Sequence, residues 1–183
     1  AVTTKAIITH VENTSRIYLQ FSEKDSLMDI ICEKLNGSKL QPKTEKAAVD
    51  DMCVVQFADD LEFYRSRILE VLEDDQYKVI LIDYGNTTVV DKLYELPQEF
   101  TLIKPVAEIC SMEPSAIFEK NKALTLTTFD ALLDSCKGVV AVEFVNKSAS
   151  PPVVRLTTKD KRSLKIYEHL QKLVQAELKL IQK

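Results

Sequence analysis

Four short segments rich in β-branched, other apolar and aromatic residues follow one another through the middle of the chain, separated by polar turns. They are Met52–Phe57, Glu62–Leu72, Tyr77–Asp83 and Thr87–Val90. Segments of this length, repeating at intervals of roughly 8–12 residues, are typical of strands in a small all-β unit. A parallel sheet would need a long crossover between consecutive strands, and these turns are too short for one. The middle of the chain is therefore predicted to be a small β-barrel.

The segments on either side of this barrel combine strands with helices. We expect strands at 5–11, 16–21, Val106–Met112, Gly138–Val145 and Val153–Thr158, and helices at Asp25–Asn36, Asn121–Ser135 and Ile166–Ile181. The N-terminal strands and helix are too short to hold a core alone, so we expect them to complete one sheet with the C-terminal segment. The predicted fold class is α+β, mainly β, with the barrel inserted into a lobe built from both ends of the chain.

One polar stretch marks the best boundary in the sequence. Residues 38–50 contain Pro42 and show no helical or strand period. We therefore divide the chain into an N-terminal part of the lobe (1–45), the barrel with its linker (46–104) and a C-terminal part of the lobe (105–183).

The charge balance narrows the kinds of partner. The 183 residues carry 24 Lys and Arg against 28 Asp and Glu, which gives a net charge of −4. Affinity for nucleic acid comes mostly from Lys and Arg neutralising phosphates, so RNA is not expected as a direct partner. A negatively charged protein favours a basic partner instead. No apolar run approaches the roughly 18 residues that indicate a membrane span, so no membrane partner is expected.

No pattern typical of a cofactor or of catalysis is present. The four cysteines are far apart and form no close pair: Cys32, Cys53, Cys110 and Cys136. His10 and His169 lie next to none of them, so no zinc site is expected and the thiols are predicted to be free. Three scattered glycines cannot form a phosphate-binding loop. We expect no metal, no cofactor and no catalytic residue, and the chain is not predicted to be an enzyme.

Two segments of the barrel resemble the signature of the Tudor domain. The first is Phe57-Ala-Asp-Asp-Leu-Glu-Phe-Tyr64-Arg65-Ser-Arg67, and the second is Val79-Ile-Leu81-Ile-Asp83-Tyr84-Gly85-Asn86. The flanking sequences are similar to those of the extended Tudor domain, in which the Tudor barrel is inserted into a lobe like staphylococcal nuclease. The resemblance covers essentially the whole chain. It implies a five-stranded SH3-like barrel inserted into a nuclease-like OB-fold lobe.

The resemblance also implies a peptide-binding site for one arginine. By motif position its residues are Phe57, Tyr64, Leu81, Tyr84 and Asn86, and the possible acidic contacts are Asp59, Asp60 and Glu62. Methylated arginine keeps its charge and loses N–H donors, so aromatic rings that attract the cation suit it. The amide of Asn86 can accept a remaining N–H. Asp83 is expected to fix the tight turn, and Gly85 to supply a positive φ.

One position departs from the family pattern. The family usually has an aromatic residue three positions before the turn tyrosine, where this chain has Leu81. Leucine has no ring face to attract a cation, so we expect a reduced preference for dimethylarginine and a site that also accepts unmodified arginine. Hydrogen bonds to Asp59, Asp60, Glu62 or Asn86 would then hold the bare guanidinium.

Other readings of these residues stay open. Alternation along a barrel strand would also place Phe57 and Tyr64 in the core of the barrel, with no role in binding. Arg65 and Arg67 are expected to be structural or to form surface pairs.

The strands of the lobe carry Arg16, Glu143 and Arg155, without the paired carboxylates that metal-assisted phosphodiester cleavage requires.

The resemblance implies a role in small-RNA pathways. Its usual ligands are the Arg-Gly-rich or Arg-Ala-rich N-terminal tails of PIWI-clade Argonaute proteins, in the cytoplasm and in perinuclear germline granules. The expected function is a non-catalytic adaptor that binds such a tail and scaffolds assembly. The alternative is an RNA-binding or purely scaffolding module whose pocket is unused.

Overall fold

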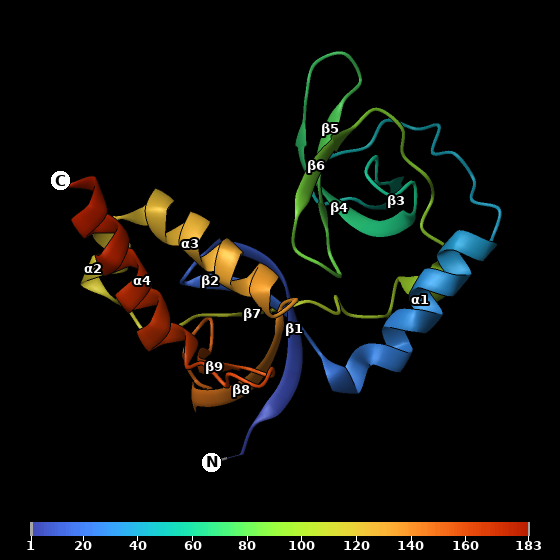
Figure 1. Cartoon of the computed structure of the whole chain (residues 1–183). Coiled ribbons are helices and arrows are strands. Elements are labelled where there is room, and N and C mark those ends of the chain that lie inside the picture. Colours follow the sequence, from blue (N-terminus) through green and yellow to red (C-terminus); the bar gives the residue numbers. More distant parts are fainter. Residues whose placement is uncertain (1, 183) are drawn as a thin grey trace. The chain divides into compact units, whose positions relative to one another are not determined.

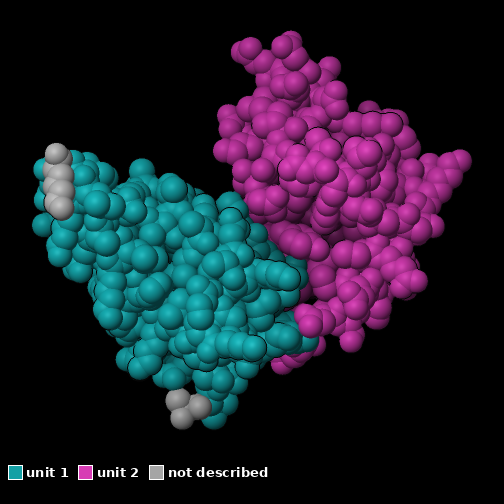
Figure 2. Space-filling view, in the orientation of Figure 1, with its two compact units in different colours: residues 1–22, 108–183 teal, residues 23–107 magenta. Residues whose placement is uncertain are grey.

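The computed structural model describes residues 2–182, which divide into two compact units (Figures 1 and 2). The first unit is formed by the chain up to Ser22 and from Glu108 onward, and the second by Glu23–Ala107. The second unit is thus inserted between the two parts of the first, as the pattern of short strands and flanking elements indicates.

The first unit is a five-stranded sheet with helices. Its strand order is β7-β2-β1-β8-β9, with β1 at Thr4–Asn13, β2 at Arg16–Phe21, β7 at Glu108–Cys110, β8 at Val139–Asn146 and β9 at Val153–Thr158. A parallel bridge between Ser111 and Val153 joins the two edges of this sheet. Its hydrogen bonds run from Ser111 N to Pro152 O at 2.9 Å and from Val154 N to Ser111 O at 2.8 Å. The sheet therefore closes on itself.

Three helices pack around this sheet: α2 (Ala116–Lys120), α3 (Lys122–Ser135) and α4 (Ile166–Ile181). The apolar stripe of α4 supplies Ile166, Leu170 and Val174 to the buried core, as its period predicts. The short helix α2 was not expected. It ends where Asn121 adopts a non-helical conformation, which also begins α3.

The second unit contains the predicted barrel strands. They are β3 (Met52–Gln56), β4 (Phe63–Val71), β5 (Tyr77–Leu81) and β6 (Thr87–Val90), in the order β3-β4-β5-β6. The chain beyond β6 returns to the free edge of β3, where Tyr94 and Val54 exchange hydrogen bonds of 2.8 and 2.9 Å. The fifth strand of the expected barrel is reduced here to isolated bridges of Tyr94, with Val54 on one side and Pro42 on the other. With the two antiparallel sheets, the structure confirms the predicted α+β fold class.

Helix α1 (Asp25–Gly37) lies in the second unit, whereas the predicted division assigned residues 1–45 to the lobe. Its buried residues Met28, Ile31 and Leu35 form one apolar cluster with Val54, Phe100 and Val106. The amphipathic pattern of the helix shows which of its faces is buried, but it does not show which neighbour covers that face.

A buried ion pair joins three segments of the second unit. Arg65 on β4 and Asp83 after β5 are 1% and 2% exposed, and Arg65 donates to Asp83 through Nε at 2.9 Å and Nη2 at 2.5 Å. The other three N–H groups of the guanidinium reach the carbonyls of Phe100, Ile103 and Lys104. All five donors of Arg65 thus have acceptors.

The structure adds a role for Asp83 to the expected one. Its carboxylate, which was expected to fix its own turn, also accepts from Arg65 and from the backbone N of Val106 at 2.9 Å. Arg65 has the structural role expected for it. Arg67 forms a surface pair with Asp50, also as expected.

Replacing Arg65 with methionine is expected to lower the free energy of unfolding by about 3–5 kcal/mol, because the Asp83 carboxylate would stay buried without its counter-charge. Urea denaturation followed by circular dichroism measures this loss. The matched control is Arg67→Met, because Arg67 and Asp50 pair at 2.9 Å with side chains 40% and 74% exposed. The control should cost less than about 1 kcal/mol. Similar losses in both variants would contradict the structural role of the buried pair.

Candidate functional site

Three of the predicted aromatic side chains form a continuous group on the second unit. The rings of Phe57 and Tyr64 contact each other edge to face, with centroids 6.1 Å apart and planes at 89°. Tyr64 and Tyr84 are arranged in the same way at 5.3 Å and 88°. All three are half-buried. The rings pack against the apolar core of the barrel and keep part of their surface open to solvent.

The turn between β3 and β4 brings a carboxylate to this group. Tyr64 donates its hydroxyl hydrogen to Asp60 Oδ2, and Asp60 Oδ1 accepts from the backbone N of Glu62 at 2.9 Å. Burial, followed by the hydrogen bond to Asp60 and the charge of Asp60, raises the pKa of Tyr64. The phenol therefore stays protonated at neutral pH and keeps its hydrogen bond. Asp59 and Glu62 are exposed on the same turn.

The turn after β5 holds the other predicted site residues. The carbonyl of Leu81 accepts from Tyr84 N at 3.1 Å and Gly85 N at 2.7 Å, while Leu81 N donates to the carbonyl of Asn86 at 2.9 Å. Gly85 has φ of 100°, which confirms the positive φ expected there and is disfavoured for residues with a Cβ. Asn86 is half-buried next to Tyr84 in the sequence.

The side chain of Leu81 lies in the core. It is 2% exposed and packs with Cys53, Ile68 and Val79. Its position in the motif predicted that it would be one of the residues of the arginine-binding site. In the structure it lies instead in the packed interior, so three half-exposed rings remain for contact with a ligand.

Helix α1 supports the rings through contacts that the sequence did not indicate. Cys32 Sγ lies 3.9 Å from the hydroxyl of Tyr84, and burial raises the pKa of this thiol, which favours its neutral form. Asn36 accepts from Phe63 N at 2.8 Å, at the start of β4. Both residues are exposed or half-buried positions of an amphipathic helix, and no local pattern distinguishes them from ordinary surface positions.

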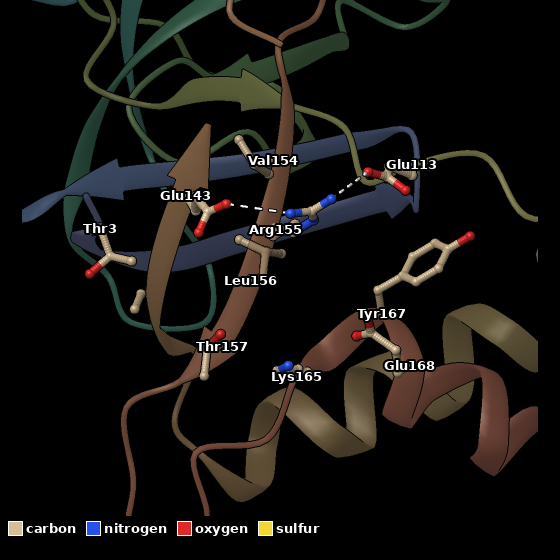
Figure 3. A pocket seen from close by; sticks show the side chains of 11 residues that line it. Thr3, Glu113, Glu143, Val154, Arg155, Leu156, Thr157, Lys165, Tyr167 and Glu168 are labelled. Carbon is tan, nitrogen blue, oxygen red and sulfur yellow. Dashed lines mark ion pairs between the residues drawn. The ribbon is translucent and has the colours of Figure 1, made fainter. Parts of the chain in front are cut away.

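A cavity of the first unit is lined by β8, β9 and the start of α4 (Figure 3). It measures about 310 Å³. Arg155 lies within it between two carboxylates, with Glu113 at 3.6 Å and Glu143 at 3.5 Å. Arg16, the other arginine singled out in the lobe, pairs with Glu12 at 2.9 Å. Both arginines therefore face carboxylates, which compete with any phosphate for the guanidinium.

No group of three or more His, Cys, Asp and Glu side chains within residues 2–182 could hold a metal ion. Within the same range, none of the helices has the length and apolar character needed to cross a bilayer. The four cysteines are free, as predicted.

Comparison with known proteins gives one family and one fold. The model of the Tudor domain family matches residues 1–114. Human Tudor domain-containing protein 1 is 25% identical over 167 residues, which are 80% of this chain and 14% of that protein. The chain thus spans a small part of this curated relative. The comparisons indicate no enzyme family.

Two solved structures are similar over nearly the whole chain. The extended Tudor domain of human TDRD1, solved with a symmetrically dimethylated peptide, has a TM-score of 0.79 and 15% identity, covering 94% of this chain and 88% of that one. A complex of Tudor with Aubergine carrying a symmetrically dimethylated arginine has a TM-score of 0.77 and 24% identity, covering 92% and 99%. At these identities the likeness establishes the extended Tudor fold.

The Asp60→Asn variant is expected to lower the pKa of Tyr64 toward its ordinary value, because the substitution removes the negative charge that disfavours the phenolate. A pH titration of tyrosine Cζ chemical shifts by NMR measures the change. Asp59→Asn is the control, because no hydrogen bond joins Asp59 to the Tyr64 hydroxyl. An unchanged pKa in Asp60→Asn would mean that burial alone sets the shift.

Proposed function

Because the chain belongs to the Tudor domain family, we propose that it is a non-catalytic module that binds one arginine side chain of a basic peptide against Phe57, Tyr64 and Tyr84. The observation that carries this proposal is the continuous group of three half-exposed rings, with centroids 6.1 and 5.3 Å apart along the series. A packed core would hide such rings, and a plain surface would seldom gather them.

The chemistry of these rings suits a guanidinium ion. An aromatic face attracts a cation within about 6 Å of its centroid, with roughly 0.5–2 kcal/mol per ring depending on desolvation. The hydrogen bond from Tyr64 to Asp60 adds a carboxylate next to the rings. Asn86 follows Tyr84 by two residues, and its side-chain oxygen can accept an N–H of the ligand.

The buried position of Leu81 supports a weak preference for the methylated form. A three-ring site offers less attraction to a poorly hydrated methylated cation than a four-ring site would. Unmodified arginine keeps all five N–H donors, for which Asp60 and Asn86 offer acceptors. The site is therefore proposed to accept both forms.

The proposed partner is the arginine-rich tail of a PIWI-clade Argonaute protein, bound in cytoplasmic germline granules. The fold is shared with a Tudor chain solved in complex with Aubergine that carries dimethylarginine. A net charge of −4 and the exposed acids Asp59 and Glu62 favour association with a basic segment, mainly through the rate of encounter. The module would thus scaffold assembly in a small-RNA pathway.

Replacing Tyr84 with alanine is expected to weaken binding of an Arg-Ala peptide carrying symmetric dimethylarginine by at least tenfold, because one ring face and its contact with Tyr64 are lost. Isothermal titration calorimetry measures the dissociation constant. Tyr84→Phe is the control, because it keeps the ring and removes only the hydroxyl, and it should stay within about threefold of the unchanged chain. A purely scaffolding module would show no binding to lose.

The same peptide with unmodified arginine is expected to bind within tenfold of the dimethylated form, which corresponds to less than about 1.4 kcal/mol. The reason is the missing fourth ring at Leu81. Calorimetry on the two peptides, matched in every other residue, gives the ratio directly. A larger preference for the methylated peptide would contradict the expected effect of Leu81.

A further inference from the structure

Leu61 stands out on the turn that carries Asp60. Its side chain is 66% exposed, and its backbone has φ of 60°. This left-handed conformation is unfavourable for a residue with a Cβ, because Cβ approaches the following carbonyl oxygen. Leu61 thus combines a strained backbone with an apolar side chain in water.

Other non-glycine residues with positive φ in the described chain differ from Leu61 in side-chain chemistry. They are Asp50, Asp74, Asp75, Lys137 and Ser163. Asp and Ser have short polar side chains, which are common in turns because they hydrogen-bond to the nearby backbone. Leucine forms no such bond. Strain of this kind persists where the surrounding structure imposes it, and it gathers at functional sites.

Hydrogen bonds fix the turn around Leu61. Its backbone N donates to the carbonyl of Phe57 at 2.8 Å, and Phe57 N donates to the carbonyl of Glu62 at 2.9 Å. The side chain of Gln56 donates to the carbonyl of Leu61 at 2.9 Å. The Asp60 carboxylate ties the same turn to the hydroxyl of Tyr64. The backbone of Leu61 is therefore fixed on the turn between Phe57 and Tyr64, which carry two rings of the aromatic group.

We propose that Leu61 is a specificity-determining residue that contacts an aliphatic side chain adjacent to the bound arginine, and so favours Arg-Ala or Arg-Val over Arg-Gly. This inference rests on the proposed function. Leu61 lies on the turn between Phe57 and Tyr64, so its exposed side chain is available to a residue that flanks an arginine held by these two rings. The acids on both sides of Leu61 attract the basic peptide, and the leucine selects the residue that flanks the arginine.

The test compares two peptides with one dimethylarginine each, Val-Arg-Val and Gly-Arg-Gly in the same polar background, by calorimetry. The unchanged chain should bind the valine peptide roughly tenfold more tightly, since burying a few methyl groups has an effect of this size. Leu61→Asn should reduce the ratio to about threefold or less, because asparagine tolerates the left-handed backbone and offers no apolar surface. Leu61→Met keeps an apolar side chain and should keep most of the preference.

Stability provides the second measurement. Leu61→Asn should raise the melting temperature by about 2–4 °C as backbone strain is relieved, so weaker selection cannot then be attributed to unfolding. Asp75→Gly is the matched backbone control, because Asp75 has φ of 56° on an exposed turn, and it should leave the peptide ratio unchanged.

The outcomes separate this inference from the proposed function. If Tyr84→Ala abolishes binding of both peptides while Leu61→Asn leaves their ratio unchanged, the role of Leu61 is wrong and the arginine site stands. If the unchanged chain binds both peptides equally, the inference also fails. If Tyr84→Ala leaves both affinities intact, the arginine site itself fails and the inference fails with it.

Discussion

The buried pair of Arg65 and Asp83 is the interaction on which the geometry of the aromatic group depends. Each member is adjacent in sequence to a ring of the group: Tyr64 precedes Arg65, and Tyr84 follows Asp83. The bidentate contact, at 2.9 and 2.5 Å, therefore fixes the distance between β4 and the turn after β5. Tyr64 and Tyr84 are attached to the backbone at these two positions. Edge-to-face packing of Tyr64 on Tyr84 at 5.3 Å is the visible consequence.

Alternation along β4 explains how one strand supplies both a ring of the aromatic group and the arginine of the buried ion pair. Successive side chains of a strand point to opposite faces, so Tyr64 is half-exposed while Arg65 is buried. Burying an arginine has a large desolvation cost, which is offset only when the charge is paired and every donor is satisfied. Here the carbonyls of Phe100, Ile103 and Lys104 complete that set. The segment after the barrel is thereby part of the support for the rings.

Local patterns in the sequence were sufficient for most of the fold and for the central rings. Strand alternation located β3 to β6, helical periods located α1, α3 and α4, and the motif located Tyr64 and Tyr84. Contacts between distant segments left no such pattern. The approach of Cys32 to Tyr84 and the assignment of α1 to the second unit depend on which surfaces meet. The burial of Leu81 is a different case, because alternation along β5 places it on the same face as the buried Val79; only its position in the motif pointed to the site.

The two carboxylates near the rings differ in what they can do for a ligand. Asp83 is 2% exposed and bonded to Arg65 and Val106, so its charge is already neutralised and its oxygens are out of reach. Asp60 lies on an exposed turn, where its charge faces water and is screened by salt over about 8–10 Å. Such a charge speeds the encounter with a basic peptide more than it strengthens the complex. Discrimination between ligands must then come from contacts that act only at short range: the ring faces, the hydrogen-bond acceptors of Asp60 and Asn86, and the apolar contacts beside them.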